Sequence, residues 1–341
     1  MSTPEPTPVR ELRDVSAAQF RAEILPARQP VVLRGLVADW PAVRAGRESP
    51  HAMANYLRGF DTGASADTMF GDPSIGGRFF YNDELTGHNF QRRPQRIVES
   101  LERLLALLDH PDPEALYVGA VPTPASMPGF ARDNTLPLAD AGAVPRVWIG
   151  NRVTVQTHYD ISQNIACVVA GRRRFTLFPP EQLVNLYVGP LEFTLAGQPI
   201  SMARLDQPDF GKFPRFRAAL ASALRAELEP GDALYVPYMW WHHVESRERF
   251  NVLVNYWWDE TPAWQGSPFE ALLHAILSIK SLPPDKRALW RAVFDHYIFQ
   301  TGGDPVAHLT PRQQGIQGPP SPQIAEVLRA QLLHVLSRRR W

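Results

Sequence analysis

Residues 154–160 read Thr-Val-Gln-Thr-His-Tyr-Asp, and this stretch decides the fold class. The Val- and Thr-rich composition of residues 153–160 predicts a β-strand. His158 and Asp160 are two positions apart, so their side chains project from the same face of that strand. An imidazole beside a carboxylate is a donor pair that suits Fe(II), and two histidines with one carboxylate leave the opposite side of the ion open. The prediction of a metal site therefore requires one more histidine.

Residues 230–244 supply candidates for that histidine. They begin with Pro-Gly-Asp, which favours a tight turn, and continue through an apolar strand to Trp-Trp-His-His-Val. Neighbouring residues on a strand face opposite ways, so periodicity leaves both His242 and His243 open as the third ligand. A His-x-Asp pair alone is more often solvated or packed in a core. Together with the turn, the apolar strand and the Trp-His sequence, it indicates a metal site.

The bulk composition is that of a globular protein. The chain has 341 residues, of which 44% are hydrophobic, enough for one large domain or two ordinary ones. Its 35 basic and 35 acidic residues cancel, so we expect no nucleic-acid or membrane partner. Cys167 is the only cysteine, which fits a reducing compartment and a cytoplasmic location. The N-terminal residues are polar, and we expect neither a secretory leader nor a membrane span.

Short strands follow one another through the middle of the chain, without alternating helices outside one long insertion. They are predicted at residues 115–121, 146–150, 153–160, 164–170, 173–178, 232–237, 241–246 and 251–258. This arrangement predicts an antiparallel barrel or a double-sheet jelly roll. Residues 1–12 are expected to be a loose polar tail, and 60–73 a loop or short edge strands. A buried strand is predicted at 30–36, and helices at 15–24, 51–58, 97–108, 268–278, 284–298 and 324–336.

Several short motifs together resemble one family. They are Trp-Ile-Gly at 148–150, His-Tyr-Asp at 158–160, Gly-Arg-Arg-Arg at 171–174, Leu-Phe-Pro-Pro at 177–180, Pro-Gly-Asp at 230–232, Trp-Trp-His-His-Val-Glu-Ser at 240–246 and Val-Asn-Tyr-Trp at 254–257. In combination they are similar to the JmjC-type, cupin-like (cupin_8) Fe(II)/2-oxoglutarate-dependent oxygenases. Within these, they resemble the subgroup of the asparaginyl hydroxylase factor inhibiting HIF.

The resemblance implies a mainly β fold with flanking helices around a double-stranded β-helix, the jelly-roll or cupin core. Residues 1–114 would form N-terminal helices and strands that pack on the barrel. Residues 115–260 would form the JmjC/cupin-like core with an insertion at 180–230, in which residues 182–216 resemble the segment that covers the active site. Residues 261–341 would form a C-terminal helical region, through which such proteins often form homodimers.

The resemblance also implies the metal ligands. In the family the ligand is the first histidine after the tryptophan, which selects His242 and leaves His243 as a packing residue. The implied catalytic triad for Fe(II) is therefore His158, Asp160 and His242. The open side of the metal would then take 2-oxoglutarate and dioxygen.

The cosubstrate contacts are implied in the same way. A lysine usually binds the distal carboxylate of 2-oxoglutarate, and Arg173 stands at that position here. Arginine can bind a carboxylate through two parallel hydrogen bonds, although the three arginines 172–174 are alternatively a solvated charge run. The family also places Thr or Ser three residues before the first ligand, where this chain has Val155. The other implied contacts are Tyr117, Asn164, Asn255, Trp257 and, on either side of Val155, Thr154 and Thr157.

Substrate contacts are the least specified. Tyr81 and Trp240 are candidate cleft residues, with core packing as the alternative for each. The Arg-Gln pair with which the asparaginyl enzyme binds its substrate amide has no match near Pro199 and Ile200, so asparagine is not carried over as the target.

These observations favour an Fe(II)- and 2-oxoglutarate-dependent dioxygenase that hydroxylates a protein or peptide side chain or a small molecule. An alternative is a cupin-like metal-binding regulatory or binding protein without 2-oxoglutarate turnover. A cupin-type isomerase or hydrolase that uses Zn is a third hypothesis, and it would need no cation at position 173.

Overall fold

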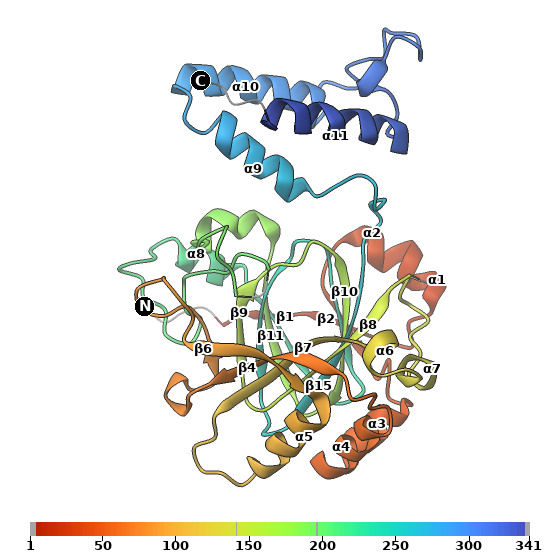
Figure 1. Cartoon of the computed structure of the whole chain (residues 1–341), viewed down its shortest axis with the longest axis vertical. Coiled ribbons are helices and arrows are strands. Elements are labelled where there is room, and N and C mark those ends of the chain that lie inside the picture. The colour runs from red at the N-terminus through yellow and green to blue at the C-terminus, as the bar shows by residue number, and fades with distance from the viewer. Residues whose placement is uncertain (1–4, 141, 196, 338–341) are drawn as a thin grey trace. The chain divides into compact units, whose positions relative to one another are not determined.

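A computed structural model describes residues 5–140, 142–195 and 197–337 of the chain. The chain divides into two compact units, with the boundary after Asp259. The first unit contains the two β-sheets, and the second is helical (Figure 1).

The larger sheet has nine strands. In spatial order they are β2 (Arg10–Arg13), β3 (Val31–Arg34), β13 (Ala233–Val236), β10 (Gln163–Ala170), β15 (Asn251–Trp258), β8 (Val144–Gly150), β7 (Ala115–Pro122), β4 (Ser65–Gly71) and β6 (Phe90–Arg96). Strands β2 and β3 run parallel, and the other neighbours are antiparallel.

The smaller sheet has six strands. Their order is β1 (Thr7–Pro8), β12 (Leu224–Leu228), β11 (Arg173–Phe178), β14 (Trp241–Ser246), β9 (Thr154–His158) and β5 (Arg78–Phe79). The four middle strands are antiparallel, whereas the short outer strands β1 and β5 pair in parallel. In the β9–β14 pair His158 lies opposite His242.

Side-chain alternation separates the barrel interior from the outer face of the nine-stranded sheet. On β15, Val252, Val254 and Tyr256 belong to the outer cluster, whereas Leu253 packs in a second cluster with Phe175 of the opposite sheet. That second cluster closes part of the space between the two sheets. The two sheets with a shared interior confirm the predicted jelly-roll core.

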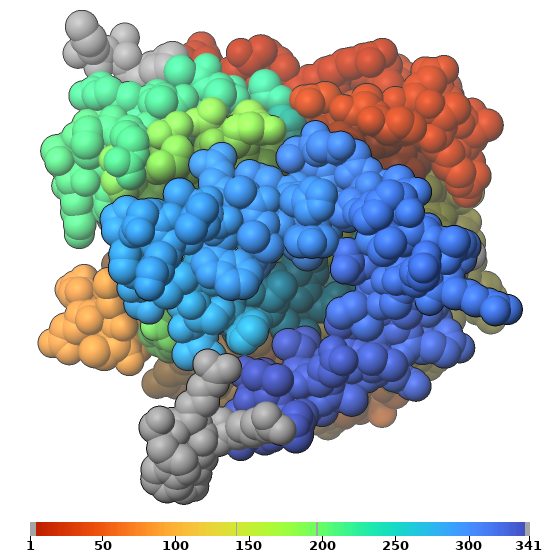
Figure 2. Space-filling view, turned by 90° about the horizontal axis from the view of Figure 1, so that it is seen from above, coloured from red at the N-terminus to blue at the C-terminus, as the bar shows by residue number. Residues whose placement is uncertain are grey.

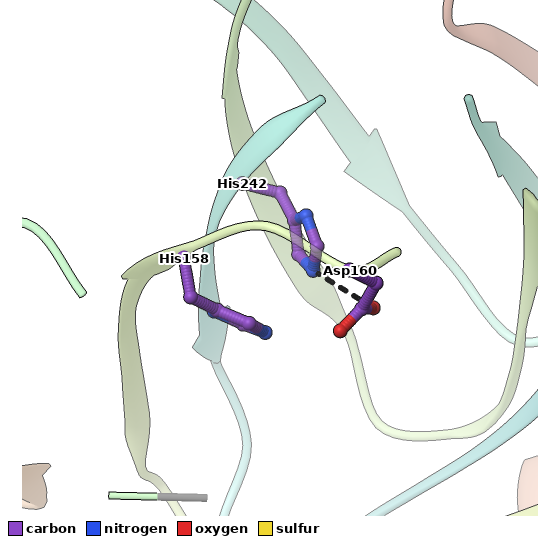
Figure 3. A group of neighbouring side chains, drawn as sticks. All are labelled: His158, Asp160 and His242. Carbon is purple, nitrogen blue, oxygen red and sulfur yellow. Dashed lines mark ion pairs between the residues drawn. The ribbon is translucent and has the colours of Figure 1, made fainter. Parts of the chain in front are cut away.

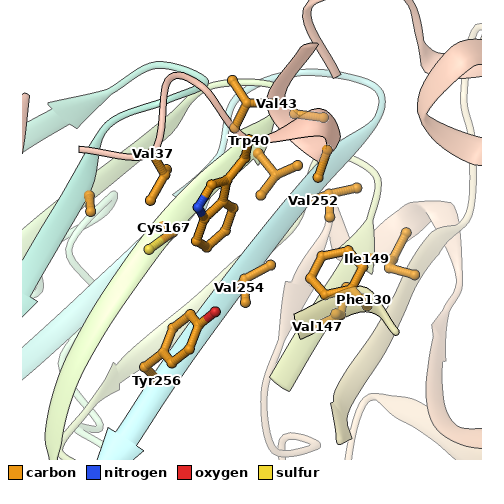
Figure 4. Close-up of a cluster of buried hydrophobic side chains, with 14 of the residues drawn as sticks. Val37, Trp40, Val43, Phe130, Val147, Ile149, Cys167, Val252, Val254 and Tyr256 are labelled. Atoms are coloured by element: carbon orange, nitrogen blue, oxygen red, sulfur yellow. The ribbon is translucent and has the colours of Figure 1, made fainter. Parts of the chain in front are cut away.

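N-terminal helices cover the outer face of the nine-stranded sheet. Val37, Trp40 and Val43 pack there against the strands that carry Val147 and Cys167 (Figure 4). Burial of such side chains stabilises a fold by about 1.5–3 kcal/mol each. The covering helices are α3 (Pro41–Glu48), α4 (Pro50–Arg58) and α5 (Ile97–Ala106).

The remaining helices of the first unit are short. They are α1 (Ala17–Gln19), α2 (Leu25–Ala27), α6 (Thr123–Ser126), α7 (Phe130–Asp133) and α8 (Phe216–Ala221). A π-helical turn at Phe20–Ile24 separates α1 from α2, and 3₁₀ turns occur at Pro73–Ile75 and Pro180–Asn185.

Two segments differ from their predictions, and a third matches one of its two alternatives. The expected polar tail at residues 1–12, of which 1–4 lie outside the described residues, contains β1 and most of β2. The segment at 60–73, predicted as a loop or short edge strands, contains the seven-residue strand β4, next to the edge strand β6. Strand β6 was not predicted, because its sequence carries three arginines and a proline at the exposed edge of the sheet. In each case pairing with a neighbouring strand, rather than an apolar sequence pattern, determines the structure.

The second unit is described by itself. Its helices are α9 (Pro268–Ser278), α10 (Pro284–Tyr297) and α11 (Pro322–Ser337), with a 3₁₀ turn at Gly315–Gln317; they are coloured blue in Figure 2. Many of their large apolar side chains are exposed, among them Leu277, Leu289, Trp290 and Leu333. Among the described residues, no helix is both long and apolar enough to cross a membrane.

Candidate metal centre

Three side chains converge at one end of the barrel interior (Figure 3). His158 ends β9, Asp160 follows two residues later, and His242 is the second residue of β14. One possible ligand atom from each lies within 4.8 Å of those of the other two. The Nε2 atom of His242 is 3.6 Å from Oδ2 of Asp160, and the two imidazole centroids are 4.2 Å apart. The sheet register therefore brings together residues that are far apart in sequence.

Backbone carbonyls orient both imidazoles. Nδ1 of His158 is 2.8 Å from the carbonyl oxygen of Gln156, and Nδ1 of His242 is 3.0 Å from that of Trp240. A carbonyl oxygen only accepts, so each Nδ1 carries the proton and each Nε2 keeps a free lone pair. Histidine ligands of metals are commonly oriented in this way. Burial, with the adjacent His158 adding, lowers the pKa of His242 to about 4, which favours the neutral form that binds metal.

His243 faces the opposite side of the sheet from His242. It is buried, and its Nδ1 lies 3.4 Å from the Thr157 hydroxyl. Burial lowers the pKa of His243 to about 3. The geometry thus resolves the alternative left open by the sequence in favour of His242 as the third member of the cluster.

A cavity of about 130 Å³ adjoins the three residues. Its walls are mostly apolar and aromatic, with a few polar side chains that point inward. The residues that line it come from both sheets and from the insertion, and they include Met69, Phe79, Tyr117, Trp148, Val155, Asn164, Arg173, Leu195, Gln198, Asn255 and Trp257. An apolar cavity with a small number of polar groups is the usual form of a small-molecule site.

Arg173 is the charged residue of the cavity wall outside the cluster. Its side chain is 1% exposed, and its Nε and Nη2 atoms have no hydrogen-bond partner among the described residues. The Tyr117 hydroxyl interacts with the guanidinium; burial raises the pKa of Tyr117, and the charge of Arg173 opposes that rise. A buried cation without an anion is costly, so the arrangement fits an anionic ligand inside the barrel.

The other predicted cosubstrate residues divide into two groups. Asn164, Asn255 and Trp257 line the cavity, and Asn255 Nδ2 donates to Asn164 Oδ1 over 2.7 Å. Thr154 and Thr157 do not line it, because the adjacent Val155 takes the inward position on β9. Both side chains lie on the outer face of β9: Thr157 is the neighbour of the inward His158, and the irregular register between β9 and β14 places Val155 rather than Thr154 toward the cavity.

Both predicted substrate residues lie away from this cavity. The Tyr81 hydroxyl donates to the Phe193 carbonyl over 2.5 Å, and Trp240 Nε1 donates to the Arg28 carbonyl over 3.1 Å. Their bulk is buried, so the alternative of core packing describes them. Gln198, which lines the cavity, was not predicted, since it lies in an irregular part of the insertion where no periodicity marks the inward side.

A model of the cupin-like domain matches residues 17–263. The chain belongs to the cupin-like domain family. The match spans both sheets from β3 onward and includes all three members of the His-Asp-His cluster.

Members of this family and its relatives carry diverse names. The chain is 27% identical to mouse "tRNA wybutosine-synthesizing protein 5" over 269 residues, which are 75% of this chain and 79% of that protein. It is 26% identical to fruit-fly "Jumonji C domain-containing protein 5" over 260 residues, 74% of this chain and 60% of the relative. It is 36% identical to "Lysine-specific demethylase JMJ31" of Arabidopsis over 102 residues, 30% of this chain and 18% of the relative. The match thus spans less than two thirds of the length of several relatives.

Proposed function

We propose that the protein is a non-haem Fe(II)- and 2-oxoglutarate-dependent oxygenase that hydroxylates a protein or peptide side chain or a small molecule. The observation that carries the proposal is that the His-Asp-His cluster shares one cavity with Arg173, a buried guanidinium whose Nε and Nη2 find no partner among the described residues. The donor set of two imidazoles and one carboxylate fits Fe(II) with one side open.

Fe(II) and 2-oxoglutarate in this cavity would supply an oxidation by dioxygen, with one oxygen atom entering a substrate C–H bond, the other entering succinate, and CO₂ released. The chain's own residues position the reactants. Carbonyl groups of Gln156 and Trp240 hold the two imidazoles. The free Nε and Nη2 edge of Arg173 matches a carboxylate in a two-bond arrangement. The apolar lining, including Phe79 and Leu195, keeps water from the reacting groups.

Arg173 also distinguishes this proposal from the alternatives. A metal-binding module without 2-oxoglutarate turnover, or a Zn-dependent isomerase or hydrolase, has no need for a buried guanidinium beside the metal. The printed names of the relatives refer to a tRNA modification in one case and to lysine demethylation in another. Because these targets differ, the names of the relatives do not indicate one substrate class for this chain, and that class has to be inferred from the residues of its own cavity.

The test is cosubstrate turnover by the full-length, Fe(II)-loaded protein in air. We expect release of succinate from 2-oxoglutarate, and we expect its loss in the His158→Ala variant, which lacks one donor. Succinate release no greater than that of the variant, from wild-type protein shown to retain Fe(II), would count against an oxygenase.

A further inference from the structure

A polar cleft lies on the outer face of the six-stranded sheet, on the other side from the metal cluster. In the parallel pair of β5 and β9, Arg78 lies opposite Thr154 and Phe79 opposite Val155. Phe79 and Val155 line the barrel cavity, whereas Arg78 and Thr154 line the cleft. The alternation along two short strands thus separates the two sites.

The cleft has two adjoining parts of about 550 and 590 Å³. Both parts are lined by Arg78, Asp83, Asn89 and Arg204. The buried His243 lines one part, beside Thr154. Strand β14 therefore turns His242 toward the barrel and His243 toward the cleft.

Arg78 has an unused hydrogen-bonding edge in this cleft. Its Nε and Nη2 atoms are buried and find no partner in the described part of the chain. These two groups form one side of the guanidinium plane, the side that binds carboxylate or phosphate through parallel hydrogen bonds. The carbon of the guanidinium lies 3.9 Å from the centroid of the Phe80 ring, a stacking contact that holds the plane while leaving this edge free.

Nearby carboxylates already have other partners. Asp206 pairs with Arg204, and Glu245 pairs with Arg174 and Arg247. Asp83 is exposed, and within the described ranges no carboxylate forms an ion pair with Arg78. Among the described residues, Arg78 thus has no carboxylate at ion-pair distance, although Asp206 lies close enough to act on its charge.

The electrostatic surroundings of Arg78 agree with this reading. Burial and, to a smaller extent, the positive charge of Arg204 together lower the pKa of Arg78 to about 10, while the charge of Asp206 acts in the opposite direction. The guanidinium still carries its charge at neutral pH, in surroundings that solvate it poorly.

We infer that this cleft is an accessory oxyanion site, in which the Nε and Nη2 edge of Arg78 binds a carboxylate or phosphate group. The bound group would hold a larger molecule on the protein and would not itself be oxidised, because the six-stranded sheet separates it from the metal cluster. The site also adjoins the segment that covers the barrel: Met202 and Arg204 line the cleft, whereas Ile200 of the same segment lines the metal cavity.

The test uses the full-length protein loaded with metal and saturated with 2-oxoglutarate, so that Arg173 is already occupied. Inorganic phosphate and acetate are titrated separately by calorimetry. We expect saturable binding of at least one of them, weakened about tenfold or more by Arg78→Met, since charge-assisted hydrogen bonds are lost. Binding of phosphate but not acetate assigns a phosphate group, and the reverse assigns a carboxylate.

A matched control is Arg217→Met. Arg217 stacks on the Phe210 ring in a similar way, with 3.7 Å between guanidinium carbon and ring centroid, but it does not line the cleft; binding should be unchanged in this variant. Arg78→Lys keeps the charge without the two-bond edge and should show an intermediate loss, which also covers the case in which Arg78→Met does not fold. Wild-type affinity in both Arg78 variants, or no anion binding by the wild type, would overturn the inference.

Discussion

Replacement of Arg173 by methionine should separate cosubstrate binding from stability. Arg173 is buried, and two of its nitrogens lack partners in the described chain. Methionine is of similar length, has no charge and fills the same space. The variant should therefore lose the carboxylate contact of the pocket without losing the fold.

The environment of Arg173 determines the expected changes in 2-oxoglutarate affinity and in the free energy of unfolding. Hydrogen bonds to charged groups contribute about 1.5–3 kcal/mol each, so loss of two should weaken 2-oxoglutarate binding by about 100-fold or more. An uncompensated buried charge destabilises a fold by about 3–5 kcal/mol, so its removal should be neutral or stabilising. The Tyr117 hydroxyl loses its interaction with Arg173, which costs about 1 kcal/mol. The free energy of unfolding without 2-oxoglutarate should thus be equal to that of wild type or higher.

Two measurements check these expectations. Urea unfolding of the metal-loaded protein without 2-oxoglutarate gives the stability, and anaerobic titration with 2-oxoglutarate gives the affinity. Arg174→Met is the matched control, because the adjacent Arg174 faces outward and pairs with Glu227 and Glu245 at the surface; surface pairs contribute only about 0–1 kcal/mol. The reasoning is refuted if Arg173→Met binds 2-oxoglutarate as wild type does, or if Arg174→Met shows the same loss.

Three further predictions concern other parts of the molecule. His242→Ala should weaken Fe(II) binding by roughly 100-fold or more in an anaerobic competition with a chromophoric chelator, whereas His243→Ala should bind Fe(II) as wild type does; the opposite order would reassign the ligand. We propose that the chain forms a homodimer through its C-terminal helices. Leu289 is 69% exposed, so Leu289→Glu should give monomers in sedimentation velocity, whereas the control Lys286→Glu should remain dimeric. A monomeric wild type would contradict the proposal. Burial between two phenylalanine rings lowers the pKa of His88, so the folded state holds it neutral and stability should fall as pH drops below the unfolded value of about 6.5. Wild type should therefore lose free energy of unfolding relative to His88→Phe as the pH falls from 8 to 5.5. A difference between the two proteins that does not change with pH would exclude this effect of His88.

The sequence predicted those parts of the fold that depend on apolar alternation. Strand β11 and strand β15 have the predicted bounds, because most of their buried side chains are apolar and pack between layers of the fold, with Arg173 and Asn255 as polar exceptions. Strands β2 and β6 were missed, since both are rich in charged residues and form by pairing with a neighbour. Apolar composition predicts a strand that packs against other residues, and it does not predict an edge strand whose outer side faces water.

The same distinction applies to the site. His158 and Asp160 were recognisable because two-residue spacing on a regular strand puts them on one face. Thr157 lies on the outer face, as alternation from His158 requires, whereas the position of Thr154 could not be predicted, because the irregularity between β9 and β14 turns Val155 inward and leaves no mark in the sequence. It could not be predicted either that Nε and Nη2 of Arg173 and of Arg78 find no hydrogen-bond partner among the described residues, since this depends on which acceptors the folded chain brings near each guanidinium.

The most direct test of the central claim is anaerobic titration of the Fe(II)-loaded protein with 2-oxoglutarate, followed by visible absorption. The account predicts a saturable metal-to-ligand charge-transfer band that requires His158, Asp160 and His242 and is weakened in Arg173→Met. Intact Fe(II) binding without such a band at saturating 2-oxoglutarate would contradict the account and favour a metal-binding protein that does not use this cosubstrate.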